Sequence, residues 1–143
     1  RAVQLSLRTN QFNLNGIRKT REEIMNAIQQ ENSLNWIIDV KDRFGDYGIV
    51  GLLLAKNNQK TLILESFLLS CRVLGRGVEN IILSELKTHC MIHQLDNIEA
   101  MFQATPKNKP FIDFLLQTDW KADHQTNTHN FLIKQTTQEI LYK

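Results

Sequence analysis

Short apolar runs alternate along this chain with polar or glycine-containing segments. Four of these runs have the length and side-chain types of buried strands, and they span residues 34–40, 49–55, 61–69 and 97–104. The amides of 57–59 favour a tight hairpin between the second and third runs, whereas the polar segment 41–48 predicts a longer turn before the second. A loosely alternating segment, 2–12, precedes them, and we expect 120–122 and 131–136 to form a final hairpin.

A helical period appears at three places between the strands. Thr20 and Glu23 form a capping box, so the first helix should begin there and end near Gln30. Apolar residues at helical spacing predict that this helix buries Ile24, Ala27 and Ile28. The same spacing predicts a second helix from Val78 to about Ile92, with a buried face of Val78, Ile81, Ile82, Leu86 and Cys90. Pro110 suits the start of a third helix. This order of elements predicts an α+β fold with a mixed central sheet flanked by helices.

Composition and charge leave this picture unchanged and exclude several functional classes. The 143 residues, 42% of them hydrophobic and 22% charged, suffice for one domain with a real core. A net charge of +2 without a basic block argues against nucleic-acid binding, and no apolar run approaches the roughly 20 residues that cross a bilayer. Two cysteines without a secretory signal favour a reduced, cytoplasmic setting. Because a strand pattern follows Arg1 at once, we expect residues 1–143 to be one domain of a longer protein.

The junction between the third strand and the second helix carries the strongest candidate chemistry. It reads Arg-Val-Leu-Gly-Arg-Gly from Arg72 to Gly77 and ends where the helix begins. Free backbone N–H groups and the positive end of the helix dipole meet there, which is how many proteins hold a phosphate. Gly75 and Gly77 let a ligand approach the backbone, and Arg72 and Arg76 add positive charge. The residues expected to bind the cofactor at this junction are Leu69, Arg72, Val73, Leu74, Gly75, Arg76 and Gly77.

Two well-known phosphate motifs do not fit this turn. A dinucleotide-binding fingerprint would need a third glycine where Asn80 stands, and a P-loop would need Gly-Lys followed by Ser or Thr. The turn does fit R-x-x-G-x-G, which resembles the pyrophosphate-binding motif of the GNAT acyltransferase superfamily, whose members bind coenzyme A or phosphopantetheine. For these residues taken alone, a tight turn into a core helix without any ligand is the alternative.

The resemblance to GNAT enzymes extends past the turn and implies a GNAT-like fold. Asn108 takes the position of an asparagine that touches the pantetheine arm, Phe114-Leu115 that of an aromatic pair, and Asp119-Trp120 that of a final glycine-aromatic step. Leu115 stands where the superfamily usually has a tyrosine that protonates the leaving thiolate. A leucine cannot donate a proton, so the standard acid of acetyl transfer is missing.

Three separated blocks, in order along the chain, resemble the C-terminal domain of FkbH-like proteins. They are 9–14 (Thr-Asn-Gln-Phe-Asn-Leu), 42–48 (Asp-Arg-Phe-Gly-Asp-Tyr-Gly) and 66–79, which contains the glycine turn. In that family a HAD-type domain comes first, and the whole protein transfers a glyceryl unit from 1,3-bisphosphoglycerate to an acyl carrier protein, for methoxymalonyl-type extender units in polyketide biosynthesis. The HAD motif D-x-D-x-T/V is absent from this chain.

The FkbH-like resemblance has consequences for partners and for the substrate site. It implies two partners, an acyl carrier protein and an N-terminal HAD-like domain of the parent chain. It also singles out the amides Asn10, Gln11 and Asn13, which could bind the polar part of an acyl group. Amides that satisfy the backbone at the end of a strand are the alternative.

Two residues are candidates for catalysis. Cys71 stands beside Arg72 and close to the amino terminus of a helix, and both features lower the pKa of a thiol, so its thiolate could accept an acyl group. Glu65 on the central strand is a candidate base by resemblance to GNAT enzymes. The alternatives are a small residue that packs at a strand end and a solvent-facing carboxylate. His89 and His93 have the spacing of a metal pair without a third ligand, so we expect no metal.

Together these observations predict acyl transfer, specifically of a glyceryl group, to a phosphopantetheine thiol on coenzyme A or on an acyl carrier protein. An N-acetyltransferase that uses acetyl-CoA is the first alternative. A non-catalytic domain that only recruits a carrier protein is the second.

Overall fold

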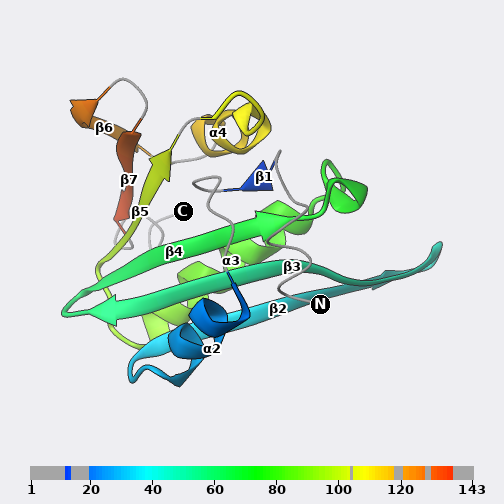
Figure 1. Ribbon diagram of the computed structural model, residues 1–143, viewed down its shortest axis with the longest axis horizontal. Coiled ribbons are helices and arrows are strands. Elements are labelled where there is room, and N and C mark those ends of the chain that lie inside the picture. The colour runs from blue at the N-terminus through cyan, green and yellow to red at the C-terminus, as the bar shows by residue number, and fades with distance from the viewer. Residues whose placement is uncertain (1–11, 14–19, 104, 118–120, 128–129, 137–143) are drawn as a thin grey trace.

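A computed structural model describes residues 12–13, 20–103, 105–117, 121–127 and 130–136 (Figure 1). Its elements follow the chain as β1 (Phe12–Asn13), α2 (Arg21–Gln29), β2 (Ser33–Asp42), β3 (Gly45–Asn58), β4 (Thr61–Leu69), the 3-10 turn η1 (Cys71–Val73), α3 (Val78–Ile92), β5 (Asn97–Gln103), α4 (Lys109–Leu116), β6 (Lys121–Asn127) and β7 (Asn130–Thr136). The expected order of strands and helices is therefore confirmed.

The described strands form one mixed sheet in the order β2-β3-β4-β5-β7-β6, and β1 pairs with β4 outside this path. The β4–β5 pair is parallel, with α3 as its crossover, and the other pairs are antiparallel. Two helices cover opposite faces of the sheet (Figure 1): α3 packs through Leu86 on one, and α2 packs through Ile24 on the other. Because β3 is covered on both sides, its residues from Val50 to Ala55 are all buried. The predicted α+β class is confirmed.

The first helix begins as its sequence predicts. Thr20 is the N-cap of α2, and its hydroxyl accepts a hydrogen bond from the Glu23 backbone N–H at 3.2 Å. Of the three residues expected on the buried face, Ile24 is buried and Ala27 is half-buried, whereas Ile28 is exposed. The helix therefore buries a narrower face than expected: Ile24 packs with Leu52 and Leu68, and Ala27 packs against the same cluster.

Two further expectations from the pattern of apolar residues are corrected. Ile81 is exposed, and Leu83 takes a place in the buried face of α3 beside Ile82, Leu86 and Cys90. The segment 41–48 is not a long turn, because β2 and β3 continue into it until only Arg43 and Phe44 lie between them. One Asp42 carboxylate oxygen accepts hydrogen bonds from the N–H groups of Phe44 and Gly45, at 2.8 and 3.1 Å, and so closes a tight turn.

Candidate functional site

The glycine turn connects the end of β4 to the start of α3, as its sequence predicts. Gly75 and Gly77 have φ angles of +75° and +84°, in the left-handed region that glycine adopts without steric cost, and Gly77 is the N-cap of α3. A Cβ added at either glycine would meet no other atom within 4 Å. Glycine is therefore required by the backbone conformation, and the space beside the backbone is open for a ligand.

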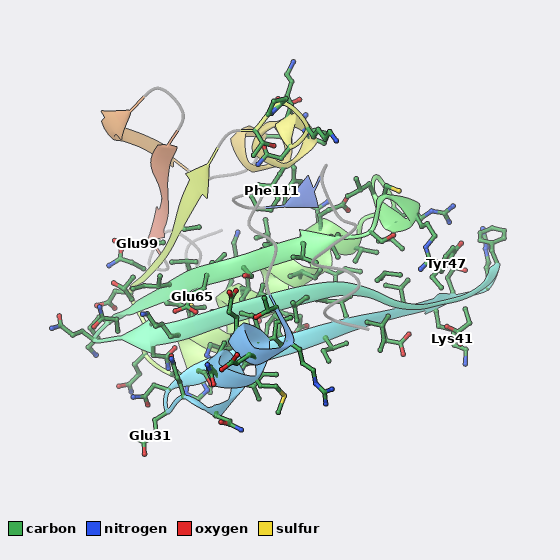
Figure 2. All side chains as sticks on the ribbon, in the orientation of Figure 1. Glu31, Lys41, Tyr47, Glu65, Glu99 and Phe111 are labelled. Carbon is green, nitrogen blue, oxygen red and sulfur yellow. The ribbon has the colours of Figure 1, made fainter. Side chains whose placement is uncertain are left out.

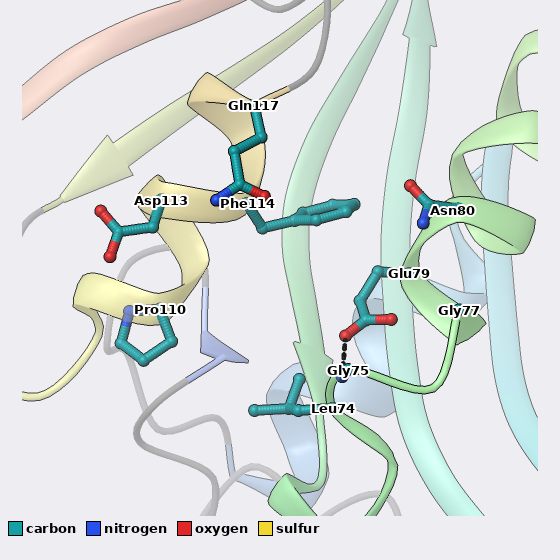
Figure 3. Close-up of a pocket in the computed structure, with 9 residues that line it drawn as sticks. All are labelled: Leu74, Gly75, Gly77, Glu79, Asn80, Pro110, Asp113, Phe114 and Gln117. Carbon is teal, nitrogen blue, oxygen red and sulfur yellow. Dashed lines mark hydrogen bonds between the residues drawn. The ribbon is translucent and has the colours of Figure 1, made fainter.

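A pocket of about 320 Å³ lies between this turn and α4 (Figure 3). Its lining comes from the turn, the first residues of α3 and one face of α4, and consists of Leu74, Gly75, Gly77, Glu79, Asn80, Pro110, Asp113, Phe114 and Gln117. Three of the residues expected to bind a cofactor thus come together in one cavity: Leu74, Gly75 and Gly77. Two others, Leu69 and Val73, are fully buried in the core, so their side chains serve packing.

The two arginines of the motif form hydrogen bonds with Tyr47. An Arg76 Nη1 donates to the Tyr47 hydroxyl at 2.7 Å, with the guanidinium 5.1 Å from the ring centroid, and an Arg72 Nη2 donates to the Tyr47 carbonyl oxygen at 3.2 Å. Tyr47 lies on the β2–β3 hairpin, at the end of the sheet that Figure 2 labels with Tyr47 and Lys41. Both side chains are absent from the pocket lining. Their role as phosphate ligands stays a prediction, and it would require them to leave Tyr47.

A carboxylate occupies the place expected for a phosphate. The Glu79 Oε1 accepts a hydrogen bond from the Gly75 backbone N–H at 2.8 Å, and Glu79 is only 6% exposed (Figure 3). Asp113 on α4 is the other carboxylate of the lining, and no lysine or arginine is among the residues of the described chain that form it. Sequence reasoning did not single out Glu79. The available signal was an acidic residue in the first turn of a helix that follows a glycine turn.

Beside the pocket, the strands β4 and β5 part from each other. They pair only from Thr61 with Asn97 to Leu64 with Ala100, although both strands continue further. The β3–β4 register shifts at the same level, between Leu54 and Ala55 of β3, and Glu65 is the extra residue of β4 at this β-bulge. Beyond this point β1 pairs with β4, opposite Leu68 and Leu69. It thereby provides hydrogen-bond partners for β4 backbone groups that β5 no longer reaches.

The two candidate catalytic residues lie apart from the pocket. Glu65 forms an ion pair with Lys56 at 3.3 Å and is half-buried. It lies on β4, at the level where β4 and β5 part, and does not line the cavity. Cys71 is exposed at the start of η1 rather than at the first residue of α3. The catalytic roles of both residues therefore stay predictions.

Asn108 is a buried residue that shapes the loop before α4. Its Oδ1 accepts a hydrogen bond from the Thr105 N–H at 2.7 Å, and its own N–H donates to the Thr105 hydroxyl at 3.2 Å. Its carbonyl oxygen accepts from the Phe111 N–H at 3.1 Å, at the start of the helix that carries Phe114. Asn108 thus holds α4 against the pocket, and its predicted contact with a pantetheine arm stays untested.

The remaining candidate residues have mixed outcomes. Asn10 and Gln11 lie outside the described residues, and of Asn13 only the backbone is described, in β1 opposite Leu68. The His89 and His93 rings lie 4.3 Å apart between centroids, and no group of three or more possible metal ligands occurs in the described part of the chain. Within that same part, no helix is long and apolar enough to span a membrane.

Solved structures with a similar fold include several acetyltransferases. The ribosomal-protein-S18-alanine N-acetyltransferase of Escherichia coli matches with a TM-score of 0.71 at 10% identity, over 95% of this chain and 85% of its own. The PaiA N-acetyltransferase of Thermoplasma acidophilum, in complex with coenzyme A, matches with a TM-score of 0.66 at 12% identity, over 82% and 71% of the two chains. A GNAT-family acetyltransferase of Staphylococcus aureus Mu50 gives 0.63 at 11% identity, over 81% and 75%.

No protein-family profile matches the chain, and no curated protein sequence matches it. The identities to the solved structures are low, so the likeness establishes the fold. The chain has the GNAT acyltransferase fold, as the R-x-x-G-x-G turn and the order of elements predict.

Proposed function

We propose that this domain binds the phosphopantetheine arm of coenzyme A or of a holo acyl carrier protein and takes part in acyl transfer to its thiol. One observation carries this proposal: the pocket places the open backbone of Gly75 and Gly77 opposite α4, next to the point where β4 and β5 part. An elongated ligand could rest its phosphate on the turn and direct its thiol towards the parted strands. The coenzyme A bound to the PaiA enzyme, which shares the fold, supports this choice of ligand.

The finer part of the proposal concerns the acyl group and the partners. The three FkbH-like blocks support a glyceryl group, an acyl carrier protein and an N-terminal HAD-like domain, in the supply of methoxymalonyl-type extender units. In such a protein the phosphate chemistry belongs to the other domain, because this chain lacks the D-x-D-x-T/V motif. The task left to this domain is to present the pantetheine thiol.

Amine acetylation with acetyl-CoA is the second candidate, because the solved structures of similar fold include N-acetyltransferases. Leu115 at the usual tyrosine position weighs against it, since it offers no proton to the leaving thiolate. The two reactions differ in their acceptor. Release of free coenzyme A from acetyl-CoA in the presence of amines would favour acetylation. Acyl transfer onto a holo carrier protein would favour the first proposal.

Calorimetric titration with coenzyme A tests the binding step. We expect Gly77→Val to abolish binding, because its branched side chain would strain the left-handed N-cap and fill the space beside the turn. Gly48→Val is the matched control: Gly48 has a φ of +67° and equally open surroundings, but it lies on the β2–β3 hairpin outside the pocket lining.

The outcomes separate the candidate functions. Binding that Gly77→Val loses and Gly48→Val keeps would support a phosphate site at the turn. Binding to a holo carrier protein without binding of coenzyme A would favour a carrier-specific domain. If the wild-type domain binds neither ligand, the proposed function is wrong and the turn serves only the fold.

A further inference from the structure

We propose that Glu79 determines ligand specificity by competing with the ligand's phosphates for the glycine turn. The pocket would then disfavour the doubly charged pyrophosphate of coenzyme A relative to the singly charged phosphodiester of a carrier-bound arm or to an uncharged pantetheine. This inference rests on the proposed function, because it concerns the same pocket. It goes beyond that function by naming which phosphopantetheine ligands the site prefers.

The position of the carboxylate is the first observation. Glu79 is the second residue of α3, and its side chain turns back to the glycine turn, where it holds the Gly75 N–H at 2.8 Å (Figure 3). This N–H is one of the donors that a bound phosphate would need. Since Glu79 is 6% exposed, water compensates its charge poorly, and the hydrogen bond from Gly75 is correspondingly valuable.

The charges around the pocket are the second observation. Glu79 and Asp113 are both among its lining residues, and the described lining contains no cationic side chain. Arg72 and Arg76 are directed to Tyr47 instead. The positive end of the α3 dipole, equivalent to about half a charge, is already faced by the Glu79 carboxylate.

Binding of a pyrophosphate here therefore has two costs. The Glu79 carboxylate loses its hydrogen bond from the Gly75 N–H, and a doubly charged group comes close to this carboxylate in a partly enclosed pocket, where the two repel each other. The second cost is smaller for the single phosphodiester of a carrier-bound arm, and it is absent for an uncharged pantetheine. Repulsion of this kind is a common way for a protein to discriminate between two ligands that share most of their contacts.

The substitution Glu79→Gln separates charge from structure. Glutamine keeps the length of the side chain and an oxygen that can accept from the Gly75 N–H, so the turn keeps its support while the charge is removed. Glu85→Gln is the matched control, because Glu85 lies on the same helix, is exposed and does not line the pocket. Both variants change the net charge of the protein equally.

The experiment is calorimetric titration of the three proteins with coenzyme A, 4′-phosphopantetheine, pantetheine and inorganic pyrophosphate. We expect Glu79→Gln to bind coenzyme A and pyrophosphate about tenfold more tightly than wild type, which corresponds to about 1.4 kcal/mol. The gain should be similar for 4′-phosphopantetheine, whose phosphate monoester carries about −1.5 to −2 charges at pH 7, and absent for uncharged pantetheine. Glu85→Gln should match the wild type for all four ligands.

Distinct results would overturn the inference or the proposed function. If Glu79→Gln and Glu85→Gln bind coenzyme A equally, Glu79 does not set specificity, while the proposed function stands. An equal gain for pantetheine would show that Glu79 acts through the shape of the turn, which also overturns the inference. If Glu79→Gln gains affinity for inorganic pyrophosphate while no protein binds a pantetheine ligand or a holo carrier protein, the inference holds and the proposed function fails. If no protein binds any of the four ligands, the inference is wrong, and titration with a holo carrier protein decides the proposed function.

A second measurement needs no variant and covers the case in which Glu79→Gln does not fold. If carboxylates dominate the pocket, added salt should leave the affinity of wild type for coenzyme A unchanged or strengthen it, because it screens repulsion. A site built on Arg72 and Arg76 would instead weaken as salt rises. A clear loss of affinity with salt would contradict the inference.

Discussion

Cys71 and Cys90 differ in their surroundings at the scale of single residues. Cys71 is exposed at the start of η1, whereas Cys90 is fully buried on the side of α3 that packs against the sheet. Burial raises the pKa of the Cys90 thiol to about 11, because the thiolate would lose its hydration. Only the thiolate reacts with alkylating agents, so the two cysteines should differ in reactivity by orders of magnitude.

Alkylation followed by mass spectrometry tests this expectation. The native protein should take up one label rapidly at Cys71 at mildly alkaline pH, and a second only after unfolding. Cys71→Ser should remove the rapid phase without changing the slow one. Rapid labelling of Cys90 in the native protein would contradict the packing of α3 against the sheet.

Gly51 is the residue at which the sheet tolerates no side chain. A Cβ there would lie 2.6 Å from the Leu69 Cδ2 and 3.0 Å from the Ile38 Cβ, and the latter cannot move without the strand. Gly51→Val should therefore destabilise the fold by about 1–3 kcal/mol, as overpacking of cores does. Chemical denaturation measures this difference. An unchanged midpoint would show that β2 and β4 can separate there and accommodate the added side chain.

At the scale of elements, the start of α2 depends on one exposed hydroxyl. Thr20→Ala removes the acceptor of the Glu23 N–H and should destabilise the domain by about 0.5–2 kcal/mol. Thr20→Ser keeps the hydroxyl and should restore most of the loss. Thermal unfolding of the three proteins gives the comparison, and equal midpoints for Ala and Ser would mean that α2 is held by Ile24 packing alone.

The glycine turn shows how an element can be recognised while its contacts are not. Its helix begins at Val78, as predicted, because a glycine N-cap and apolar residues at helical spacing act locally. The partner of Arg76 is Tyr47, which lies 29 residues earlier in the chain. No local pattern specifies such a contact, since it depends on how the β2–β3 hairpin extends past the end of β4.

At the scale of the whole molecule, a half-buried histidine should make stability depend on pH. His89 on α3 packs against Trp36 of β2, with ring centroids 6.5 Å apart in an edge-to-face arrangement. Burial, and to a smaller extent the charge of His93, lower the pKa of His89 below its usual 6.5. The unfolded chain therefore binds more protons than the folded one once the pH falls below about 6.5, and stability should decrease on acidification.

Thermal unfolding at about pH 7.5 and about pH 5.5 tests this dependence. The midpoint should be lower at the acidic pH, and His89→Gln should reduce the difference because the glutamine does not titrate. His93→Gln should reduce it less, since burial is the larger cause of the shift. An identical decrease in all three proteins would assign the pH dependence to other groups.

The sequence by itself determined the class of fold and the location of the candidate site. Capping at Thr20, the apolar periods of the strands and the glycine turn from Arg72 to Gly77 are encoded by residues close together in the chain, so local rules predict them. Resemblance to the GNAT motif then led to the fold, which the solved structures confirm.

Only the tertiary structure decided what the site contains. The parting of β4 from β5, the closing of the pocket by α4 and the direction of Arg76 towards Tyr47 arise from elements far apart in sequence. Even the Glu79 contact, four residues from Gly75, depends on the angle at which the turn enters α3. The charge and spacing of Arg72 and Arg76 suggested a cationic phosphate site, whereas the folded chain places the Glu79 carboxylate there. The physical reason is that side chains bind the partners that the whole fold brings within reach.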